Sequence, residues 1–171
     1  MQITTGRLRI VPISMAHLES THAYSSDPEN TGFMMFLPYA SLEETQTHIR
    51  EAETMWKSEA PGYLEFVILR DGENIGGITV YFLEPHVAEL GWILDKACWG
   101  RGYASQAVRA VMAHGRQAWG IRRYIAMCDS ENAASIALMK RLGMRSSGVT
   151  GVRKNRSSDE ERVELIYQVD V

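Results

Sequence analysis

The sequence predicts a mixed α/β (α+β) fold in which an antiparallel sheet forms first and a β-α-β crossover follows. Three β-rich runs joined by short turns lie in the first half of the chain, whereas amphipathic helices alternate with strands in the second half. The chain has 171 residues, the usual size of one domain, so a second core has little room. We therefore expect a single domain, residues 1–171, with the element order β-α-α-β-β-β-α-β-α-β-β.

The first elements are a strand and two helices. Apolar and polar side chains alternate from Arg7 to Ile13, which predicts a strand. Ser14 is a candidate N-cap for the helix that follows, with His17 at the position that Glu takes in a capping box. Ser41 and Glu44 form a second capping box, and apolar side chains recur at helical spacing after it. These signals predict both helices before the central strands.

Three consecutive strands follow. Leu64–Leu69 and Ile75–Leu83 are β-rich, and Asp71 with Gly72 between them is a strong hairpin signal, because a tight hairpin turn needs residues that tolerate positive φ. Val87–Leu94 is the third run, joined to the second by a short turn. We expect an antiparallel arrangement of all three.

The second half alternates helices and strands. Gly143 follows the predicted helix Asn132–Leu142 and is expected to end it, because helices commonly end at a glycine with positive φ. Gly148–Glu161 is polar and mixed in charge, so we expect a solvated, mobile loop there. The predicted elements are, in order, a helix, a strand, a helix and a strand: Arg101–Trp119, Arg123–Cys128, Asn132–Leu142 and Val163–Val169.

Composition excludes several classes of protein. The net charge is −3 and the pI about 6.0, so we expect no nucleic-acid partner. No apolar run approaches the ~20 residues that span a bilayer, and no signal peptide is visible, so we expect no membrane association. Cys98 and Cys128 form no C-x-x-C pair, which favours a reduced, cytoplasmic protein. No cluster of metal-ligating residues appears, so we expect no metal.

The segment that carries chemistry is the glycine-rich stretch Gly100–Ala104. It follows a predicted strand and opens a helix. Glycines allow the backbone to approach a ligand, and the free N–H groups of the first helical turn attract a phosphate-like anion. A Walker A loop would need Gly-Lys-Ser/Thr, and a dinucleotide fingerprint would need Gly or Ala where Ser105 stands. The stretch therefore predicts a pyrophosphate site of another kind.

Four motifs, in this order along the chain, resemble the GNAT N-acetyltransferase superfamily: Ala88-Glu-Leu-Gly-Trp92, Trp99-Gly-Arg-Gly-Tyr-Ala104, Asn132-Ala-Ala-Ser135 and Lys140-Arg-Leu-Gly-Met144. Within it they most resemble the RimJ/RimL-like branch, named for enzymes that acetylate ribosomal-protein N-termini. The resemblance starts at Thr5-Gly-Arg-Leu-Arg9 and covers nearly the whole chain. It implies a mixed, mostly antiparallel sheet of about seven strands, flanked by about four helices, with a splay between the fourth and fifth strands.

The resemblance also implies acetyl-CoA as the acyl donor. In the family, the pyrophosphate lies on backbone N–H groups of the glycine loop and helix start, and the pantetheine arm pairs with the end of the fourth strand. For Asn132, a plain N-cap role without CoA contact stays open. The implied CoA contacts are Trp92, Ile93, Leu94, Gly100, Arg101, Gly102, Tyr103, Ala104, Ser105 and Asn132.

The usual catalytic groups of the superfamily are missing. Met139 stands where a Tyr often protonates the leaving thiolate, and Met127 where some members carry a Glu base. An amine attacks only when neutral, so a base is needed, and Glu89 in an otherwise apolar strand is our candidate. A one-residue bulge near Gly91 would turn Glu89 to the surface. Ser135 is our candidate for contacting or protonating the thiolate, although it could serve CoA binding alone.

The acceptor is expected on the opposite side of the splay from CoA, near the apolar segment Phe33–Tyr39 and the first two helices. The apolar side chains of this segment indicate an acceptor with an apolar or aromatic part, a cover that excludes water from the thioester, or packing in the core alone. We expect acetyl transfer from acetyl-CoA to a primary amine, either a protein N-terminal α-amine or a small molecule, by direct attack in a ternary complex. The alternative is an acyl-CoA-binding sensor or scaffold without turnover. The acceptor's identity and the oligomeric state, including a homodimer, stay open.

Overall fold

The computed structural model describes all 171 residues. One eight-stranded sheet has the order β1-β2-β3-β4-β5-β6-β8-β7, and every neighbouring pair is antiparallel except β5 with β6. This confirms the mixed, mostly antiparallel sheet. Its eight strands are one more than the predicted order contains, and neither β1 nor β7 corresponds to a predicted residue range. The elements are β1 (Ile3–Thr4), β2 (Arg9–Pro12), a 3₁₀ helix (Met15–His17), α1 (Leu18–Ser25), α2 (Pro28–Thr31), α3 (Leu42–Lys57), β3 (Tyr63–Arg70), β4 (Glu73–Glu84), β5 (Val87–Leu94), a second 3₁₀ helix (Lys96–Cys98), α4 (Tyr103–Ala118), β6 (Arg123–Asp129), α5 (Ala133–Arg141), β7 (Arg145–Arg153) and β8 (Arg162–Asp170).

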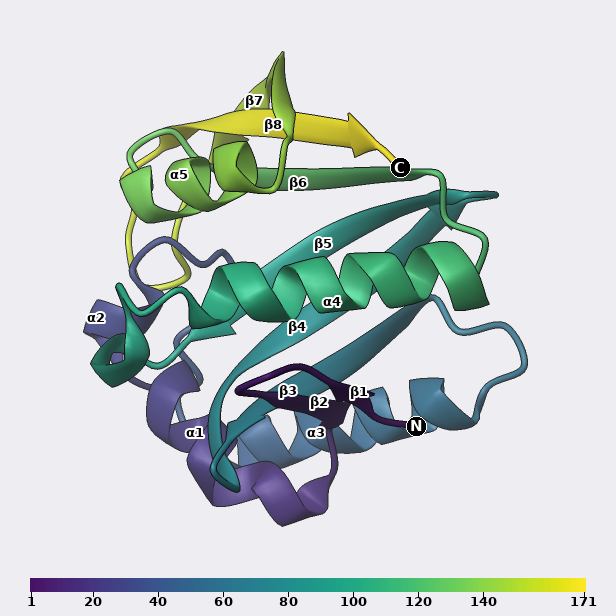
Figure 1. Cartoon of the computed structure of the whole chain (residues 1–171). Coiled ribbons are helices and arrows are strands. Elements are labelled where there is room, and N and C mark those ends of the chain that lie inside the picture. The colour runs from purple at the N-terminus through teal and green to yellow at the C-terminus, as the bar shows by residue number, and fades with distance from the viewer.

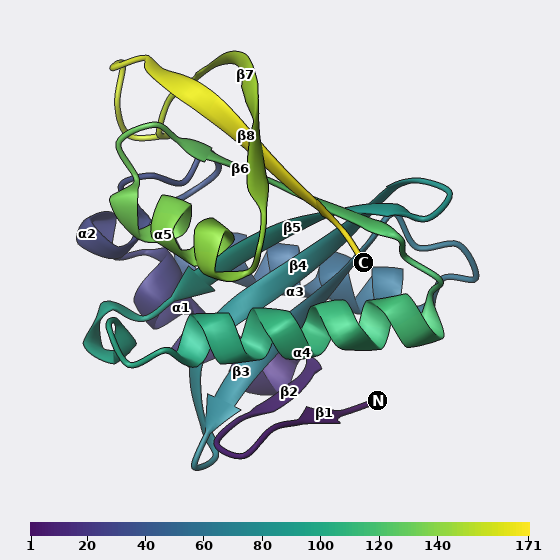
Figure 2. The same cartoon turned by 45° about the horizontal axis from the view of Figure 1, so that its top comes forward.

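Helices cover both faces of the sheet. α4 and α5 lie on one face and α1 and α3 on the other (Figures 1 and 2). Alternate residues of β3 serve the two layers, because successive side chains of a strand point to opposite faces. Phe66 and Ile68 belong to the larger core with α4, whereas Val67 and Leu69 pack with Ile49 of α3. None of the helices combines the length and the apolar character that crossing a bilayer requires.

Local chemistry explains the best-predicted boundaries. The turn between β3 and β4 has positive φ at both Asp71 (52°) and Gly72 (91°), as the hairpin signal requires. The hydroxyl of Ser41 accepts a hydrogen bond from the backbone N–H of Glu44 at 3.3 Å and so caps α3. The Glu44 carboxylate accepts from the N–H of Ala40 rather than from Ser41, which differs from a full capping box.

β5 and β6 separate soon after they meet. Their parallel pairing consists of Val87 with Arg123, Ala88 with Tyr124, and Glu89 with Ile125. Beyond Glu89, β5 runs on to Leu94 without any β6 partner, while its other edge stays paired with β4 throughout. The predicted splay is therefore present, and it opens a wedge between two halves of the sheet.

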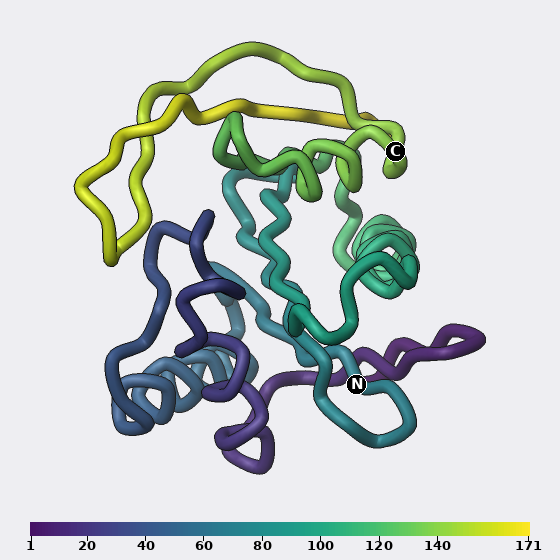
Figure 3. Tube along the Cα trace, turned by 90° about the vertical axis from the view of Figure 1, so that its left-hand side faces the viewer, coloured from purple at the N-terminus to yellow at the C-terminus, as the bar shows by residue number.

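The prediction of a loop over Gly148–Glu161 is wrong for its first part. β7 continues to Arg153 and pairs with β8, with register shifts at Gly148 and Gly151. Its side chains are almost all exposed, so the sequence lacks the apolar alternation of a half-buried strand. The tip of this hairpin, residues 154–161, crosses to the segment that follows α2 (Figure 3).

Candidate active site

A cavity of about 650 Å³ lies on the α1 and α3 face of the sheet and extends into the splay. Its floor is formed by β3, β4 and β5. Side chains of α1, α3 and the segment 33–39 form one side, and the ends of β6 and the start of α5 form the other. The cavity therefore joins the expected acceptor side to the expected donor side.

Glu89 lies in the floor of this cavity, where β5 and β6 part. The register of β4 with β5 is unbroken from Leu94 to Ala88, and the irregularity falls nearer the turn, between Phe82 and Glu84. The bulge near Gly91 that would have turned Glu89 to the surface is absent, so its side chain shares the cavity face.

Charges around Glu89 set its protonation. Burial raises the pKa of the Glu89 carboxyl, the charge of Glu164 raises it further, and Arg153 lowers it by a smaller amount. Arg153 and Glu164 form an ion pair of 3.2 Å whose side chains are only 10% and 15% exposed. Glu164 is thus neutralised by its own partner, whereas Glu89 makes no ion pair or side-chain hydrogen bond.

A second carboxylate of the cavity was not singled out in the sequence. His48 of α3 and Glu65 of β3 lie 2.8 Å apart, with side chains 30% and 12% exposed. Burial lowers the pKa of His48, but the hydrogen bond and charge of Glu65 and the charge of Glu51 together outweigh burial, so the pKa is raised overall. A Glu within the apolar run of β3 is the same signal that pointed to Glu89. Its His partner depends on how α3 packs on the sheet.

The glycine loop has the form of an anion cradle. Gly100 and Gly102 have φ of +73° and +77°, which favours glycine, and Gly102 is the N-cap of the 16-residue α4. No side chain caps this helix, so its first N–H groups are open to a ligand. A Cβ at Gly100 would meet nothing within 4 Å. Gly100, Arg101 and Gly102 are exposed, which fits a pyrophosphate held by backbone groups.

Two arginines beside the cradle were missed in the sequence. Arg7 donates to the carbonyl of Arg101 at 3.3 Å and to the side chain of Gln106 at 3.0 Å. The guanidinium groups of Arg7 and Arg70 lie 4.8 and 5.6 Å from the ring centre of Tyr103. They bring two further cations to the start of α4. Arg7 lies within Thr5–Arg9, where the resemblance starts, but Arg70 carries no comparable signal.

The edge of β5 is partly available. Trp92 and Ile93 line the cavity beyond the last pair with β6. The carbonyl of Leu94, in contrast, accepts a hydrogen bond from the indole N–H of Trp99 at 2.7 Å. This leaves Trp92 and Ile93, rather than the Leu94 carbonyl, as the open edge for an extended ligand.

The start of α5 brings Asn132 and Ser135 to the far side of the cavity. The Asn132 side-chain oxygen accepts from the Ser135 N–H at 3.0 Å, so Asn132 is an N-cap, while its amide nitrogen donates to no group of the chain. Met127 also lines the cavity, and Met139 is fully buried in the core. Burial raises the pKa of Cys128, beside them, to about 11.

The hairpin tip holds the apolar segment over the acceptor side. The amide nitrogen of Asn155 lies 2.8 Å from the carbonyl of Thr31, 2.7 Å from that of Met34 and 3.0 Å from that of Leu37. Leu37 is buried, whereas Phe36 is 75% exposed, so the segment both lines the cavity and presents apolar surface outside.

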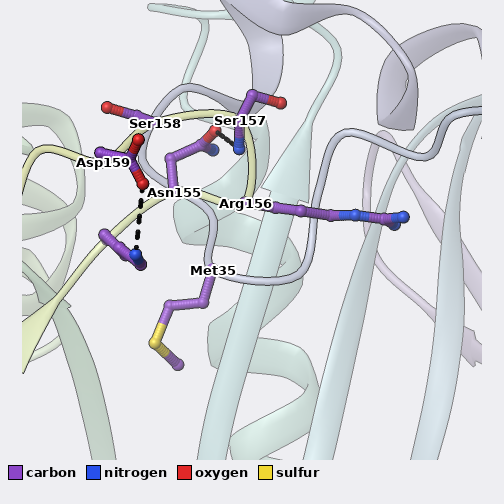
Figure 4. Close-up of a pocket in the computed structure, with 7 residues that line it drawn as sticks. Met35, Asn155, Arg156, Ser157, Ser158 and Asp159 are labelled. Carbon is purple, nitrogen blue, oxygen red and sulfur yellow. Dashed lines mark hydrogen bonds and ion pairs between the residues drawn. The ribbon is translucent and has the colours of Figure 1, made fainter.

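A second hollow of about 370 Å³ lies beside this contact, on the hairpin tip (Figure 4). Met35 lines both hollows, and the other lining residues come from 154–159. The side-chain oxygen of Asn155 accepts from the N–H of Ser157 at 2.8 Å, and Lys154 lies 3.5 Å from Asp159. These local contacts stiffen the tip that carries the Asn155 amide.

Comparison with known proteins gives three findings. Residues 7–145 match the family model described as an acetyltransferase (GNAT) domain. The uncharacterized N-acetyltransferase YnaD of Bacillus subtilis (strain 168) is 30% identical over 152 residues, which covers 86% of this chain and 85% of that protein. The ribosomal-protein-serine acetyltransferase of Escherichia coli (strain K12) is 34% identical over 90 residues, which covers 51% of this chain and 50% of that protein.

A solved structure has the same fold. The ribosomal L7/L12 alpha-N-protein acetyltransferase RimL, in complex with coenzyme A, superposes with a TM-score of 0.88 at 22% identity, over 100% of this chain and 98% of that chain. With the family match over most of the chain, the splayed sheet is that of an acyltransferase. The chain belongs to the GNAT family of acetyl-CoA-dependent N-acetyltransferases. Its relatives support the RimJ/RimL-like branch.

Proposed function

We propose that residues 1–171 form one N-acetyltransferase domain that transfers an acetyl group from acetyl-CoA to a primary amine by direct attack in a ternary complex. One observation carries the proposal. A single cavity runs from the apolar segment 33–39 to the wedge between β5 and β6, and an unpaired carboxylate, Glu89, lies where the two meet.

The donor side would be held mainly by backbone groups. The N–H groups from Gly100 to Ser105 fit a pyrophosphate, and Arg7 and Arg70 supply positive charge next to it. The open edge at Trp92 and Ile93 suits an extended amide-bearing chain. When bound, acetyl-CoA supplies the thioester that the neutral amine attacks.

Glu89 is our proposed general base. Of the three carboxylates in the cavity, Glu65 is paired with His48 and Glu164 with Arg153, so only Glu89 has no side-chain partner. Its raised pKa makes it a stronger base than an ordinary carboxylate. The apolar and aromatic walls disfavour the charged ammonium and so help its proton to leave.

Ser135 is our proposed contact for the thiolate that leaves. It lies on the first turn of α5 at the donor side, and its hydroxyl makes no hydrogen bond within the chain. Asn132 has a free amide nitrogen next to it and is the proposed CoA contact. An acyl-cysteine route through Cys128 is disfavoured, because a thiol with a pKa of about 11 is almost entirely protonated at neutral pH.

The test is thioester consumption over a panel of primary amines and N-terminal peptides. Glu89→Gln is expected to lower kcat by about 10²- to 10⁴-fold and to remove the acid limb of the pH profile, with CoA affinity kept. Ser135→Ala should have a smaller effect on kcat. Unchanged kinetics in Glu89→Gln would exclude Glu89 as base. If the wild type binds acetyl-CoA but releases CoA only at the background rate across the panel, the binding-only alternative is correct.

A further inference from the structure

The pair of Glu65 and His48 has no part in the proposed reaction, yet it faces the reaction cavity. In the sheet register Glu65 lies opposite Thr79, and Thr79 lies opposite Gly91, two residues along β5 from Glu89. Opposed residues share a face, so both carboxylates point to the same side. Two strand spacings and two residues of rise separate their Cα atoms by about 12 Å.

The charges that face the cavity are not balanced. Arg153 neutralises Glu164, and no other arginine or lysine lines the cavity. His48 is the sole partner of Glu65, and its charge is conditional, because it requires protonation of the ring. Glu89 has no partner. With His48 neutral the cavity carries two uncompensated negative charges. With His48 protonated it carries one, on Glu89, and Glu65 still keeps its Oε1 without a partner.

The walls around Glu65 suit a cation. Tyr39, Tyr63 and Tyr81 line the cavity, and burial raises the pKa of Tyr81 to about 12, so it stays a neutral phenol. Aromatic ring faces attract ammonium groups, the more so when water is excluded. The walls thus add to the attraction of the carboxylate.

A second observation concerns a buried polar atom beside the cavity. Ser25 is one of the residues that line the cavity, yet it is only 2% exposed and its buried hydroxyl oxygen has no hydrogen-bond partner in the chain. Buried polar atoms are nearly always paired, since leaving one unpaired costs free energy. If the Ser25 side chain turned towards the cavity, a donor on a bound acceptor would satisfy this oxygen.

We propose that Glu65, with Ser25 and the tyrosine walls, forms a second subsite for a cationic group of the acceptor, so that the preferred substrate is an aliphatic diamine rather than a monoamine. The inference rests on the proposed function, since it names the substrate class of the same cavity. One nitrogen reacts beside Glu89, and the other stays charged beside Glu65.

The experiment compares 1,6-diaminohexane and 1,4-diaminobutane with hexylamine and butylamine. We expect the wild type to use the better diamine with a kcat/KM at least about tenfold above its matched monoamine, as an added ionic contact of about 1.4 kcal/mol implies. Glu65→Gln should abolish this preference and leave the monoamine rates within about threefold. Glu19→Gln is the control, because Glu19 is an exposed carboxylate of α1 outside the cavity and should keep the preference.

For His48→Gln we expect the opposite of Glu65→Gln, namely that the diamine preference is kept. This second variant keeps the proposal testable if Glu65→Gln does not fold. Glutamine can still donate a hydrogen bond to Glu65 but never carries a charge, so the diamine preference should persist or increase. Loss of the preference in both variants would show a structural role and overturn the proposal. An unchanged preference in Glu65→Gln, or monoamines and N-terminal peptides used as well as diamines by the wild type, would also overturn it while leaving the proposed function intact. Absence of turnover with every amine would instead contradict the proposed function.

Discussion

The contact of Asn155 with the apolar segment gives a prediction whose size follows from the structure. One amide nitrogen lies within 3.0 Å of three backbone carbonyls, but it carries two hydrogens, so it supplies about two full hydrogen bonds. At a net ~1 kcal/mol each, Asn155→Ala should weaken the attachment of segment 31–37 to the hairpin tip by about 2 kcal/mol. That corresponds to a factor of about 30 in the ratio of attached to detached segment.

The segment lines the acceptor side of the cavity, so the two ligands should respond differently. We expect the acceptor KM to rise by up to about 30-fold and amide exchange across 31–37 to accelerate by a similar factor. Acetyl-CoA affinity, measured by titration calorimetry, should stay within about twofold, because the donor contacts lie on β5, α4 and α5. Asn155→Asp keeps the shape but places carboxylate oxygens against carbonyl oxygens, so its effect should be at least as large.

The control is Ser158→Ala on the same hairpin tip, since the Ser158 hydroxyl accepts only from the nearby N–H of Glu160. It should leave the acceptor KM and exchange rates unchanged. The reasoning is refuted if Asn155→Asp matches the wild type in both measurements, because the three carbonyls would then not depend on the amide.

Three further predictions follow from backbone and charge. Gly115→Ala in α4 should lower the free energy of unfolding, measured in urea, by about 2–4 kcal/mol. The new Cβ would clash with the hydroxyl of Tyr124 and lie 2.9 Å from the Trp119 ring. An increase in stability of ~1 kcal/mol, as expected for Gly→Ala at an exposed helix position, would contradict this. Gly102→Val should abolish CoA binding in calorimetry, since its φ of +77° disfavours valine and the side chain blocks the backbone; retained affinity would place the cradle elsewhere. Because the pKa of Glu89 is raised in the folded protein, protonating this carboxyl stabilises the folded state. This stabilisation is fully present below the ordinary pKa of 4.5 and is lost as the pH rises through the pKa of the folded state. Glu89→Gln should therefore be more stable than the wild type at pH 8, and the difference in the free energy of unfolding should vanish towards pH 4.5. A difference that does not change with pH would show that the charge of the Glu89 carboxylate does not destabilise the folded state.

Features with a local physical cause could be predicted from the sequence. The Asp71-Gly72 turn, the Ser41 cap and the positive φ of Gly143 (83°) each depend on a few adjacent residues, so their chemistry is visible in the sequence. The same holds for the cradle, because glycines before an amphipathic helix fix where its open N–H groups lie. The placement of Glu89 followed from strand alternation once the absence of a bulge was known.

Features that depend on distant contacts could not be predicted. β7 is a strand because β8 pairs with it, although its own exposed residues show no strand pattern. His48 and Glu65 lie 17 positions apart on a helix and a strand whose packing brings them together. Asn155 bonds to carbonyls at least 118 positions earlier, and nothing in a polar turn distinguishes such an amide from one in solvent. In each case the partner is selected by tertiary structure.

The wedge in the sheet also has a mechanical consequence. Three register pairs are all that the β6–β8–β7 half shares with the rest of the sheet, so this seam is short of backbone hydrogen bonds. Acetyl-CoA bound in the wedge, as proposed, would add contacts between the two halves of the sheet. It would stabilise the folded protein by RT ln(1 + [L]/Kd), about 2.7 kcal/mol at a ligand concentration of 100 times Kd. The resistance of the C-terminal half to proteolysis should then increase with the concentration of acetyl-CoA. The lifetime of the enzyme in a cell would in that case depend on the concentration of its own co-substrate.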